Sequence, residues 1–230
     1  MEAEITPPMG TSRLVQYKKV LNIRHLTNST FVLRFERGVM DFQPGQYVSV
    51  GPKGDINMRE YSIYSPTQAP YIEILIKEVE AGYVSKKLKA LKPGDLVYVE
   101  GPFGFFTLPD HGDLPLYCIG TGTGISPFHS FIQSNNSLDC LIIHGTRKAY
   151  ENYDHQDYPE NKIIHCTSQD TNADFHGRVS EYARLALAEG TLDSRGLFYL
   201  CGNCDMIYEV YDILTNAGVE GKNIFAEVYF

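Results

Sequence analysis

The sequence lacks both a membrane-length apolar run and a secretory start. No hydrophobic stretch approaches the roughly 20 residues that a transmembrane helix needs. The chain begins Met1-Glu2-Ala3-Glu4, which is acidic where a secretory signal is basic. Its 43% hydrophobic and 21% charged residues are typical of a globular protein that can bury real cores. We therefore expect a cytoplasmic protein that does not associate with a membrane.

Cysteine is scarce and odd in number. The five cysteines lie mostly inside apolar runs such as Leu116-Tyr117-Cys118-Ile119, which predicts buried thiols rather than a disulfide framework. They do not have the spacing of an iron–sulfur cluster, and no metal site is expected. Cys201 and Cys204 have the C-x-x-C spacing of a redox pair at a helix start, where the pKa of a thiol can fall. That alternative stays open.

Positive charge is also in short supply. The formal net charge is −8, and residues 1–115 hold 13 Lys and Arg against 13 Asp and Glu, whereas residues 116–230 hold 7 against 15. An acidic chain argues against nucleic acid as a partner, because phosphates attract a basic face. The exception is a cluster of lysines, Lys86, Lys87, Lys89 and Lys92. It is typical of a solvated helix face, and the alternative is a docking patch for an acidic protein.

The first half of the chain predicts strands. Short segments rich in Val, Ile, Tyr and Phe alternate with turn signals such as Gln43-Pro44-Gly45. Six such strands with short connections predict a small antiparallel barrel. The expected strands are residues 13–24, 31–36, 46–50, 58–65, 71–79 and 95–100, with one helical segment at 84–91 after Gly82.

The pattern of apolar residues changes after Gly112-Asp113. Apolar runs now alternate with segments of helical period, which predicts βαβ units and a parallel sheet. The expected strands are residues 114–119, 138–144, 162–167, 196–201 and 223–230, and the expected helices are 126–134, 178–189 and 204–216. We place a domain boundary near residue 113, which divides the chain into residues 1–113 and 114–230.

One strand-like stretch, residues 59–65, offers several ligand-binding groups in succession. Alternate side chains of a strand share a face, so Arg59, Tyr61 and Ile63 point one way while Ser62 and Tyr64 point the other. The fork of Arg59 suits a diphosphate, the ring of Tyr61 can pack on a flat heterocycle, and the Ser62 hydroxyl can donate or accept. These are the groups that a flavin needs. The alternative is an amphipathic strand with a surface arginine and two core tyrosines.

A glycine-rich loop opens the second half. Gly120 to Pro127, with the sequence GTGTGISP, follows a predicted strand and starts a predicted helix, as a nucleotide diphosphate site does. The third glycine comes one residue earlier than in G-x-G-x-x-G. Another strand ends in Cys201-Gly202, and ligands of open parallel sheets bind at the carboxyl ends of strands. The loop and Cys201 are therefore expected to share a crevice.

Taken in order, these motifs resemble the ferredoxin–NADP reductase family over nearly the whole chain, and most of all the bacterial ferredoxin (flavodoxin)–NADP reductases. The short connection from Glu78 to Gly82 leaves no room for the adenosine-binding excursion of the plant enzymes. The matching motifs are Arg59-x-Tyr61-Ser62, Gly82-x-x-Ser85, Gly101-Pro102-Phe103-Gly104, Gly120 to Pro127, Cys201-Gly202 and Glu227-Val228-Tyr229-Phe230.

The resemblance implies a barrel that binds FAD, a Rossmann-like domain that binds NADP(H), and hydride transfer between them. It implies catalytic roles for Ser62, Cys201, Glu227 and Tyr229, with Tyr229 covering the flavin face where nicotinamide must land and Phe230 beside the adenine. The implied FAD residues are Arg59, Tyr61, Ser62, Ile76, Gly82, Val84, Ser85, Tyr229 and Phe230. The implied NADP residues are Gly120, Thr121, Gly122, Thr123, Gly124, Arg147, Ser168, Arg178, Cys201 and Gly202.

One departure from the family concerns the 2′-phosphate of NADP. Many members have Ser-Arg where this chain has Ser168-Gln169-Asp170, so one cation is missing and a carboxylate stands beside it. Arg147 and Arg178 match other basic positions of the bacterial enzymes and would supply positive charge. NADP is the expected nucleotide, with NAD as the alternative.

Three functions remain open. The first is a ferredoxin or flavodoxin reductase, a monomer whose carrier docks near Lys86, Lys87 and Lys89. The second is a reductase component of an oxygenase or a free-flavin reductase, which would share every motif. The third is a non-catalytic FAD-binding redox sensor.

Overall fold

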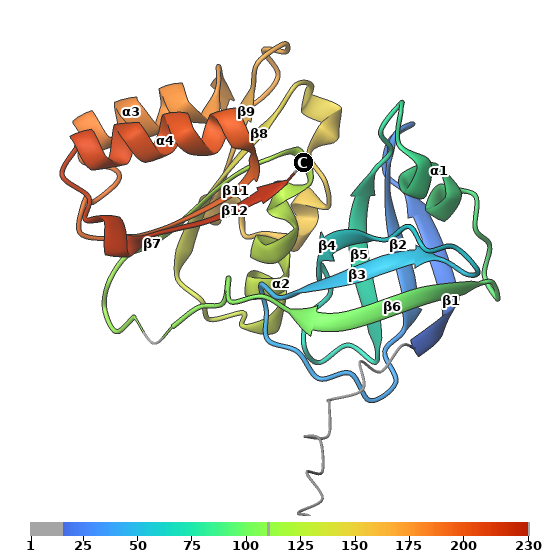
Figure 1. The fold of residues 1–230 in the computed structure, drawn as a ribbon. Helices are drawn as coiled ribbons and strands as arrows, with labels where there is room; N and C mark the ends of the chain where they lie inside the picture. Colours follow the sequence, from blue (N-terminus) through green and yellow to red (C-terminus); the bar gives the residue numbers. More distant parts are fainter. Residues whose placement is uncertain (1–15, 110, 230) are drawn as a thin grey trace, which may run out of the picture.

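The computed structural model describes residues 16–109 and 111–229. Figure 1 shows two β-sheets, an antiparallel one formed by the first half of the chain and a parallel one formed by the second. The two-domain fold class predicted from the sequence is confirmed.

The first sheet is a six-stranded antiparallel barrel. Its strand order is β4-β3-β6-β1-β2-β5, and a bridge between Ile63 and Ile74 joins the end of β4 to β5, which closes the sheet. Apolar side chains such as Phe31, Val48 and Val97 are fully buried inside it. The strands are β1 (Gln16–His25), β2 (Thr30–Glu36), β3 (Tyr47–Pro52), β4 (Arg59–Ser62), β5 (Tyr71–Lys77) and β6 (Leu96–Phe103).

A short helix, α1 (Tyr83–Lys89), caps the barrel. Val84 and Leu88 lie one helical turn apart and bury their side chains in the barrel core. The lysines of this segment fall in the last turn, where positive charge complements the helix dipole.

The second sheet is parallel, in the order β10-β9-β8-β7-β11-β12. Its strands are β7 (Leu116–Thr121), β8 (Cys140–Thr146), β9 (Ile163–Thr167), β10 (Phe175–His176), β11 (Leu197–Asn203) and β12 (Ile224–Tyr229). The α-helices are α2 (Ser126–Ser134), α3 (Val179–Ala188) and α4 (Cys204–Asn216), and 3-10 turns cover Gly122–Ile125, Ala149–Glu151, His155–Asp157, Glu160–Lys162 and Gly221–Asn223.

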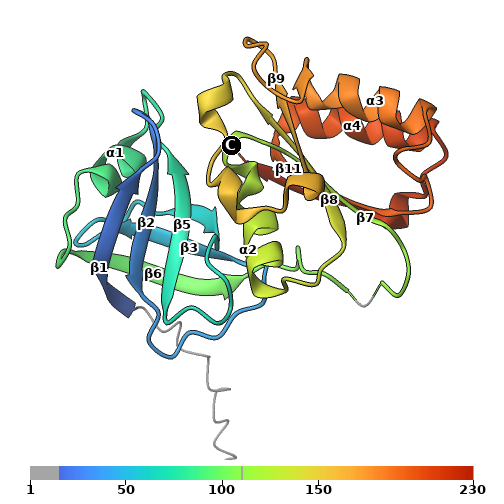
Figure 2. The same ribbon diagram turned by 180° about the vertical axis from the view of Figure 1, so that it is seen from behind.

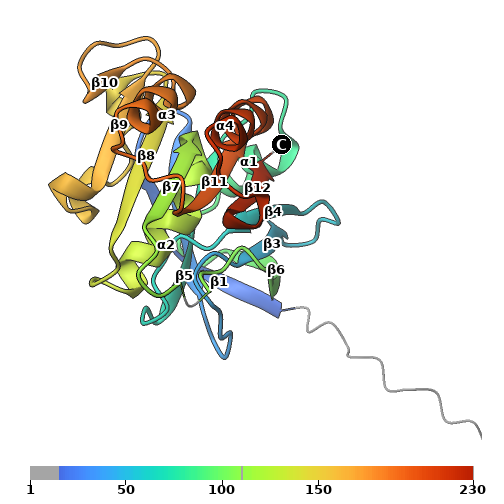
Figure 3. The same cartoon turned by 90° about the vertical axis from the view of Figure 1, so that its left-hand side faces the viewer.

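Helices cover both faces of the parallel sheet. Helices α3 and α4 lie side by side on the outer face, as Figure 3 shows, and pack their apolar side chains on β7, β8 and β11. Helix α2 covers the inner face and lies between the two sheets, which is clear from behind in Figure 2. Phe128 and Phe131 of α2 share one core cluster with Val32 and Leu75 of the barrel. The two domains are therefore joined by a common apolar core.

The predicted elements recur in the predicted order, with bounds that shift by a few residues. Of the strand expected at 13–24, residues 16–24 belong to β1, and residues 13–15 lie outside the described residues. Strand β10 and the 3-10 turns were not predicted. β10 is only two residues long and pairs only with β9, so periodicity carries no signal for it.

Candidate active site

Residues 59–65 have two faces with different neighbours, as alternation predicts. Tyr61 and Ile63 pack in the barrel core, whereas Tyr64 belongs to the cluster between the two domains. Ser62 is 3% exposed and lies on the same side as Tyr64. The strand thus presents a hydroxyl to the second domain while its other face holds the barrel together.

Ser62 links the barrel to the last strand of the chain. Its Oγ donates to Oε2 of Glu227 at 2.8 Å and accepts from the Tyr229 hydroxyl at 2.6 Å. Glu227 and Tyr229 share one face of β12 because they are two residues apart. Three of the residues predicted to be catalytic are thus hydrogen-bonded in one row across the domain boundary.

Burial sets the protonation chemistry of this row. Desolvation raises the pKa of the Glu227 carboxyl, the Ser62 hydrogen bond opposes that rise, and the nearby Glu60 adds to it. Burial also raises the pKa of the Tyr229 hydroxyl well above its ordinary value. A neutral Tyr229 can donate to Ser62, which leaves the Ser62 proton for Glu227.

Cys201 lies beside this row at the end of β11. Its register partners are Gly120 of β7 on one side and Glu227 of β12 on the other. The side chain is fully buried, and burial raises the pKa of its thiol well above the ordinary value. A redox thiol would need the opposite shift, so this environment argues against the C-x-x-C hypothesis. Cys204 is half-buried at the start of α4, and both cysteines are free.

The predicted FAD residues lie around the barrel with unequal access. Arg59 is exposed, donates to its own neighbour's carbonyl at Met58, and pairs with no carboxylate among the described residues. Ile76 and Val84 have side chains buried in the barrel core, so only their backbone groups can face a ligand. Ser85 accepts a hydrogen bond from the Val79 N–H at 3.2 Å, and its own proton remains available to an acceptor.

The glycine loop lies where the strand order reverses. From β7 the chain crosses through α2 to β8 on one side, whereas β11 flanks β7 on the other side. Open parallel sheets bind ligands at such a switch point. A Cβ on Gly124 would lie 2.3 Å from the Cys201 carbonyl oxygen, so only glycine fits. No side chain caps the first turn after Thr121, which leaves its N–H groups to a ligand.

His144 of β8 makes a hydrogen bond to the backbone of this loop, a role that was not predicted from the sequence. Its Nε2 lies 2.9 Å from the Gly122 carbonyl oxygen, which makes that nitrogen the donor. Burial lowers the pKa of the imidazole to about 3, so the ring is neutral at physiological pH. The sequence offered little indication of this role, because a single histidine within a buried strand does not by itself predict a contact with a loop.

The residues proposed for the 2′-phosphate come together at the ends of β8 and β9. The Ser168 N–H donates to the Thr146 carbonyl at 3.2 Å, and the Gly177 N–H donates to the Thr167 carbonyl at 2.9 Å. Arg147 and Arg178, the residues next to Thr146 and Gly177, therefore approach Ser168. Both arginines are exposed; their backbone N–H groups donate to Glu151 and Glu181, but neither guanidinium pairs with a carboxylate within residues 16–109 and 111–229.

The carboxylate of Asp170, next to that position in the sequence, is hydrogen-bonded to backbone N–H groups. Its oxygens accept hydrogen bonds from the backbone N–H groups of Ala149 and Asn172, and these bonds lower the pKa of the carboxyl. The lowered pKa keeps this carboxylate ionised, with part of its charge met by the two N–H groups.

The lysine cluster is partly engaged within the chain. Lys87 pairs with Asp55 at 3.1 Å and also contacts the Tyr83 hydroxyl, and Lys89 pairs with Glu78. Lys86 is exposed. The predicted adenine contact of Phe230 lies outside the described residues. None of the helices in the described ranges combines the length and apolar character needed to cross a bilayer.

Known proteins similar to this chain include FAD-binding oxidoreductases. Residues 17–108 match the oxidoreductase FAD-binding domain. The ferredoxin–NADP reductase of Azotobacter vinelandii is 28% identical over 237 residues, which cover 88% of this chain and 90% of the relative. A propane 2-monooxygenase reductase component of Mycolicibacterium smegmatis is 28% identical over 189 residues, which cover 75% of this chain. The matched region is only 54% of that longer relative.

A solved structure shares the fold over almost the whole chain. The ferredoxin NADP⁺ reductase of Neisseria gonorrhoeae, crystallised with FAD and NADP, superposes with a TM-score of 0.83 at 21% identity. The match covers 94% of this chain and 99% of that one.

Proposed function

This chain is an FAD-binding oxidoreductase similar to the ferredoxin–NADP reductases, and from that premise we propose that it passes electrons from NADPH to a small one-electron carrier. Bound FAD would take a hydride from the nicotinamide and release the electrons singly, which is chemistry that the cofactor supplies. The hydrogen-bonded row of Tyr229, Ser62 and Glu227 across the domain boundary carries this proposal.

The residues present fit the two nucleotides. The guanidinium groups of Arg59, Arg147 and Arg178 pair with no carboxylate in the described ranges, and phosphates are the groups that guanidinium forks bind best. The glycine loop brings uncapped N–H groups to the edge of the parallel sheet. We therefore assign Arg59, Tyr61, Ser62 and Ser85 to FAD, and the loop with Arg147, Ser168 and Arg178 to NADPH.

Each residue of the site has a defined task in this proposal. Ser62 holds a proton toward Glu227 and can redirect it to an acceptor that enters the site. Cys201 supplies a small, uncharged wall next to Glu227, and Glu227 orients an incoming carboxamide. Tyr229 occupies the position in front of Ser62 and has to move before a second ring can enter. These are effects of positioning rather than acid–base catalysis.

The electron acceptor has two candidates. A ferredoxin or flavodoxin that docks near Lys86 is favoured by similarity to the Azotobacter protein. An oxygenase component is favoured by relatives named as reductases of propane 2-monooxygenase and toluate 1,2-dioxygenase. We further propose a cytoplasmic monomer with its domain boundary near residue 113.

One set of assays tests the proposal. The purified protein should be yellow, release FAD on denaturation, and be reduced faster by NADPH than by NADH. Release of FMN, or a flavin that neither nucleotide reduces, would reject the function. Cytochrome c reduction coupled through ferredoxin or flavodoxin, compared with free flavin as acceptor, would separate the two candidates. A protein that binds FAD but reduces no acceptor would favour a redox sensor.

A further inference from the structure

A group of charged and polar side chains crosses the domain boundary at a second place, away from Glu227. Arg24 of β1 binds Asp154 through both guanidinium nitrogens, with Nη1 to Oδ1 at 2.6 Å and Nη2 to Oδ2 at 2.7 Å. The Tyr64 hydroxyl donates to the same Oδ2 at 2.9 Å. Arg24 and Tyr64 belong to the barrel, whereas Asp154 precedes the 3-10 turn His155–Asp157 of the second domain.

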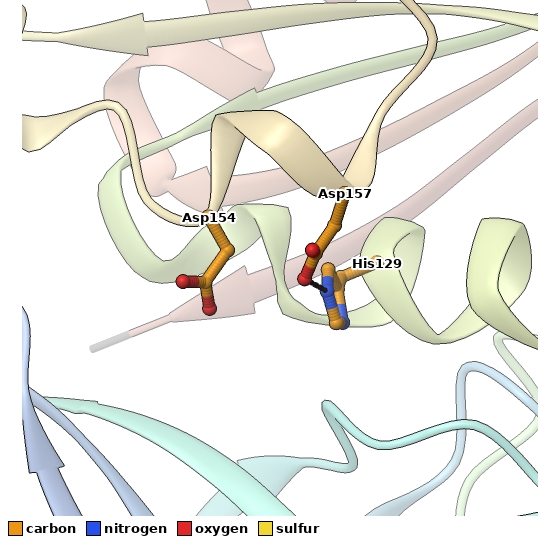
Figure 4. A group of neighbouring side chains, drawn as sticks. All are labelled: His129, Asp154 and Asp157. Carbon is orange, nitrogen blue, oxygen red and sulfur yellow. Dashed lines mark hydrogen bonds and ion pairs between the residues drawn. The ribbon is translucent and has the colours of Figure 1, made fainter.

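Helix α2 adds a third connection. The ring of His129 stacks on the ring of Tyr64 with centroids 3.7 Å apart and planes 8° from parallel. Its Nδ1 donates to the Tyr64 carbonyl oxygen at 2.7 Å, and its Nε2 lies 3.0 Å from Oδ2 of Asp157. Figure 4 shows the side chain of His129, on α2, directed toward Asp157. Asp154 lies on the same segment as Asp157. We call Arg24, Tyr64, His129 and Asp154 the interdomain anchor.

The anchor resembles a metal site in composition but not in bonding. His129, Asp154 and Asp157 place their ligand atoms within 4.8 Å of one another. However, both ring nitrogens of His129 face oxygen atoms of the protein, and both oxygens of Asp154 already accept from Arg24. The guanidinium of Arg24 supplies the positive charge that a metal would bring, so the cluster is complete as a protein contact.

Both the burial and the backbone conformation of Asp154 fit its place in the anchor. Its side chain is 5% exposed, and its backbone has φ of 50°, the one positive φ outside glycine among the described residues. Only aspartate and asparagine adopt that conformation with any ease apart from glycine. Burial acts to raise the pKa of the Asp154 carboxyl, but the hydrogen bonds and charge of Arg24, with the Tyr64 hydroxyl, outweigh it and hold the pKa below its ordinary value.

The anchor and the candidate active site are connected through residues 62–64 at the end of β4. Tyr64 is two residues after Ser62 and points to the same side, so the residue that contacts Asp154 and His129 is rigidly connected to the one that contacts Glu227. A rotation of one domain relative to the other would therefore break the bidentate Arg24–Asp154 pair and, at the same time, move Glu227 away from Ser62.

We propose that Arg24, Tyr64, His129 and Asp154 are positioning residues that set the orientation of the nucleotide domain over the barrel, and so fix the approach of nicotinamide to the flavin. The proposal rests on the function proposed above. Hydride transfer depends steeply on the distance and angle between donor and acceptor, and a displacement of about 1 Å can cost about a hundredfold in rate. Substrate affinity depends on each domain's own residues and should respond much less.

The decisive variant is Asp154→Asn, which keeps the size and the permitted backbone conformation but removes the charge and one acceptor for Arg24. Asp193→Asn is the matched control, because Asp193 also binds an arginine, Arg195, through both oxygens, but within a single domain. In anaerobic stopped-flow reduction at saturating NADPH, Asp154→Asn should slow flavin reduction by about tenfold or more, with KM within about twofold. Asp193→Asn should leave both values unchanged.

Two further measurements keep the outcome clear. Tyr64→Phe removes only the hydroxyl donor and keeps the ring stack, so it decides the matter if Asp154→Asn does not fold; it should give a smaller loss of the same kind. Amide hydrogen exchange should rise at residues 149–158 in Asp154→Asn, while exchange within β7 and β2 stays at the wild-type level. Unchanged reduction rates in folded variants, or a loss confined to KM, would overturn the proposal.

Failure of the proposed function and failure of the anchor proposal would give different experimental results. A wild-type protein that NADPH does not reduce would reject the proposed function, and hydrogen exchange would still report whether the anchor holds the domains together. A wild-type protein that is reduced normally, with variants that match it in rate and in exchange, would reject the anchor alone.

Discussion

Replacing Ser62 by alanine tests the hydrogen-bonded row directly. The change removes one oxygen that at present donates to Glu227 at 2.8 Å and accepts from Tyr229 at 2.6 Å. Two largely buried polar groups would then lose a partner. Leaving a buried group unsatisfied costs about 1–3 kcal/mol, so we expect the free energy of unfolding to fall by about 2 kcal/mol at neutral pH. For a chain of this size that corresponds to a melting temperature lower by about 4–8 °C.

The pH dependence of that loss identifies its cause. Burial raises the pKa of Glu227 above its ordinary value, so the native state binds this proton more tightly than the unfolded chain. Stability from this group is therefore complete below about pH 4.3, the unfolded value, and is lost as pH rises through the folded pKa. The Ser62 hydrogen bond lowers that pKa, so Ser62→Ala should raise it further. The part of the loss that comes from Glu227 should be small near pH 4 and grow as pH rises through the folded pKa, on top of a pH-independent part from the Tyr229 hydroxyl.

Calorimetry of the purified protein across this pH range is the assay. Ser49→Ala on the neighbouring strand is the control, since the Ser49 hydroxyl makes no hydrogen bond to a residue that the structure describes. Adding Glu227→Gln should abolish the pH-dependent part of the loss, because the amide carries no charge. An equal loss at low and neutral pH would show that the Ser62 hydroxyl does not stabilise the Glu227 carboxylate and would refute that part of the account of the row.

Three other substitutions test the ligand assignments. Arg59→Ala should weaken FAD retention by about 1.5–3 kcal/mol, the scale of a hydrogen bond to a charged group, as followed by fluorescence of released flavin; the assignment fails if retention matches that of Lys53→Ala. Arg147→Ala should raise KM for NADPH by about tenfold or more and leave KM for NADH within about twofold, and equal changes for both would remove Arg147 from the 2′-phosphate. Tyr229→Ser should tighten binding of oxidised NADP⁺ and slow turnover through delayed product release, measured by titration and steady-state kinetics; a variant with lower stability but wild-type NADP⁺ affinity would make the tail purely structural.

Much of the architecture could be read from the sequence because the two halves follow different periods. Strands such as 71–77 and helices such as 126–134 have long apolar patterns bounded by turn residues, so their existence and type were predictable. The glycine loop was predicted at residues 120–127 as a diphosphate site, whereas the contact of Gly124 with the Cys201 carbonyl, where a Cβ would lie at 2.3 Å, became visible only in the structure. The roles of individual site residues stay predictions that the assays above address.

The interdomain anchor could not be read from the sequence. Arg24 and Asp154 are 130 residues apart, and nothing near either residue marks it as half of a pair. His129 looks like an ordinary member of an amphipathic helix, and Tyr64 like an ordinary core tyrosine. Only the packing of α2 between the two sheets brings the four side chains together. Local patterns predict elements, whereas contacts between domains depend on how those elements are assembled.

The two-faced strand at 59–65 also limits how the length of this chain can vary. Because its side chains alternate between the barrel core and the domain boundary, inserting or deleting one residue would exchange both sets at once. A single-codon deletion would then be more damaging than most substitutions there. The preceding hairpin tip, where Ile56 is 96% exposed, carries no such constraint, and its length can change at small entropic cost. An insertion at the exposed Ile56 that keeps the ion pair of Asp55 with Lys87 should therefore be tolerated better than any insertion within residues 59–65.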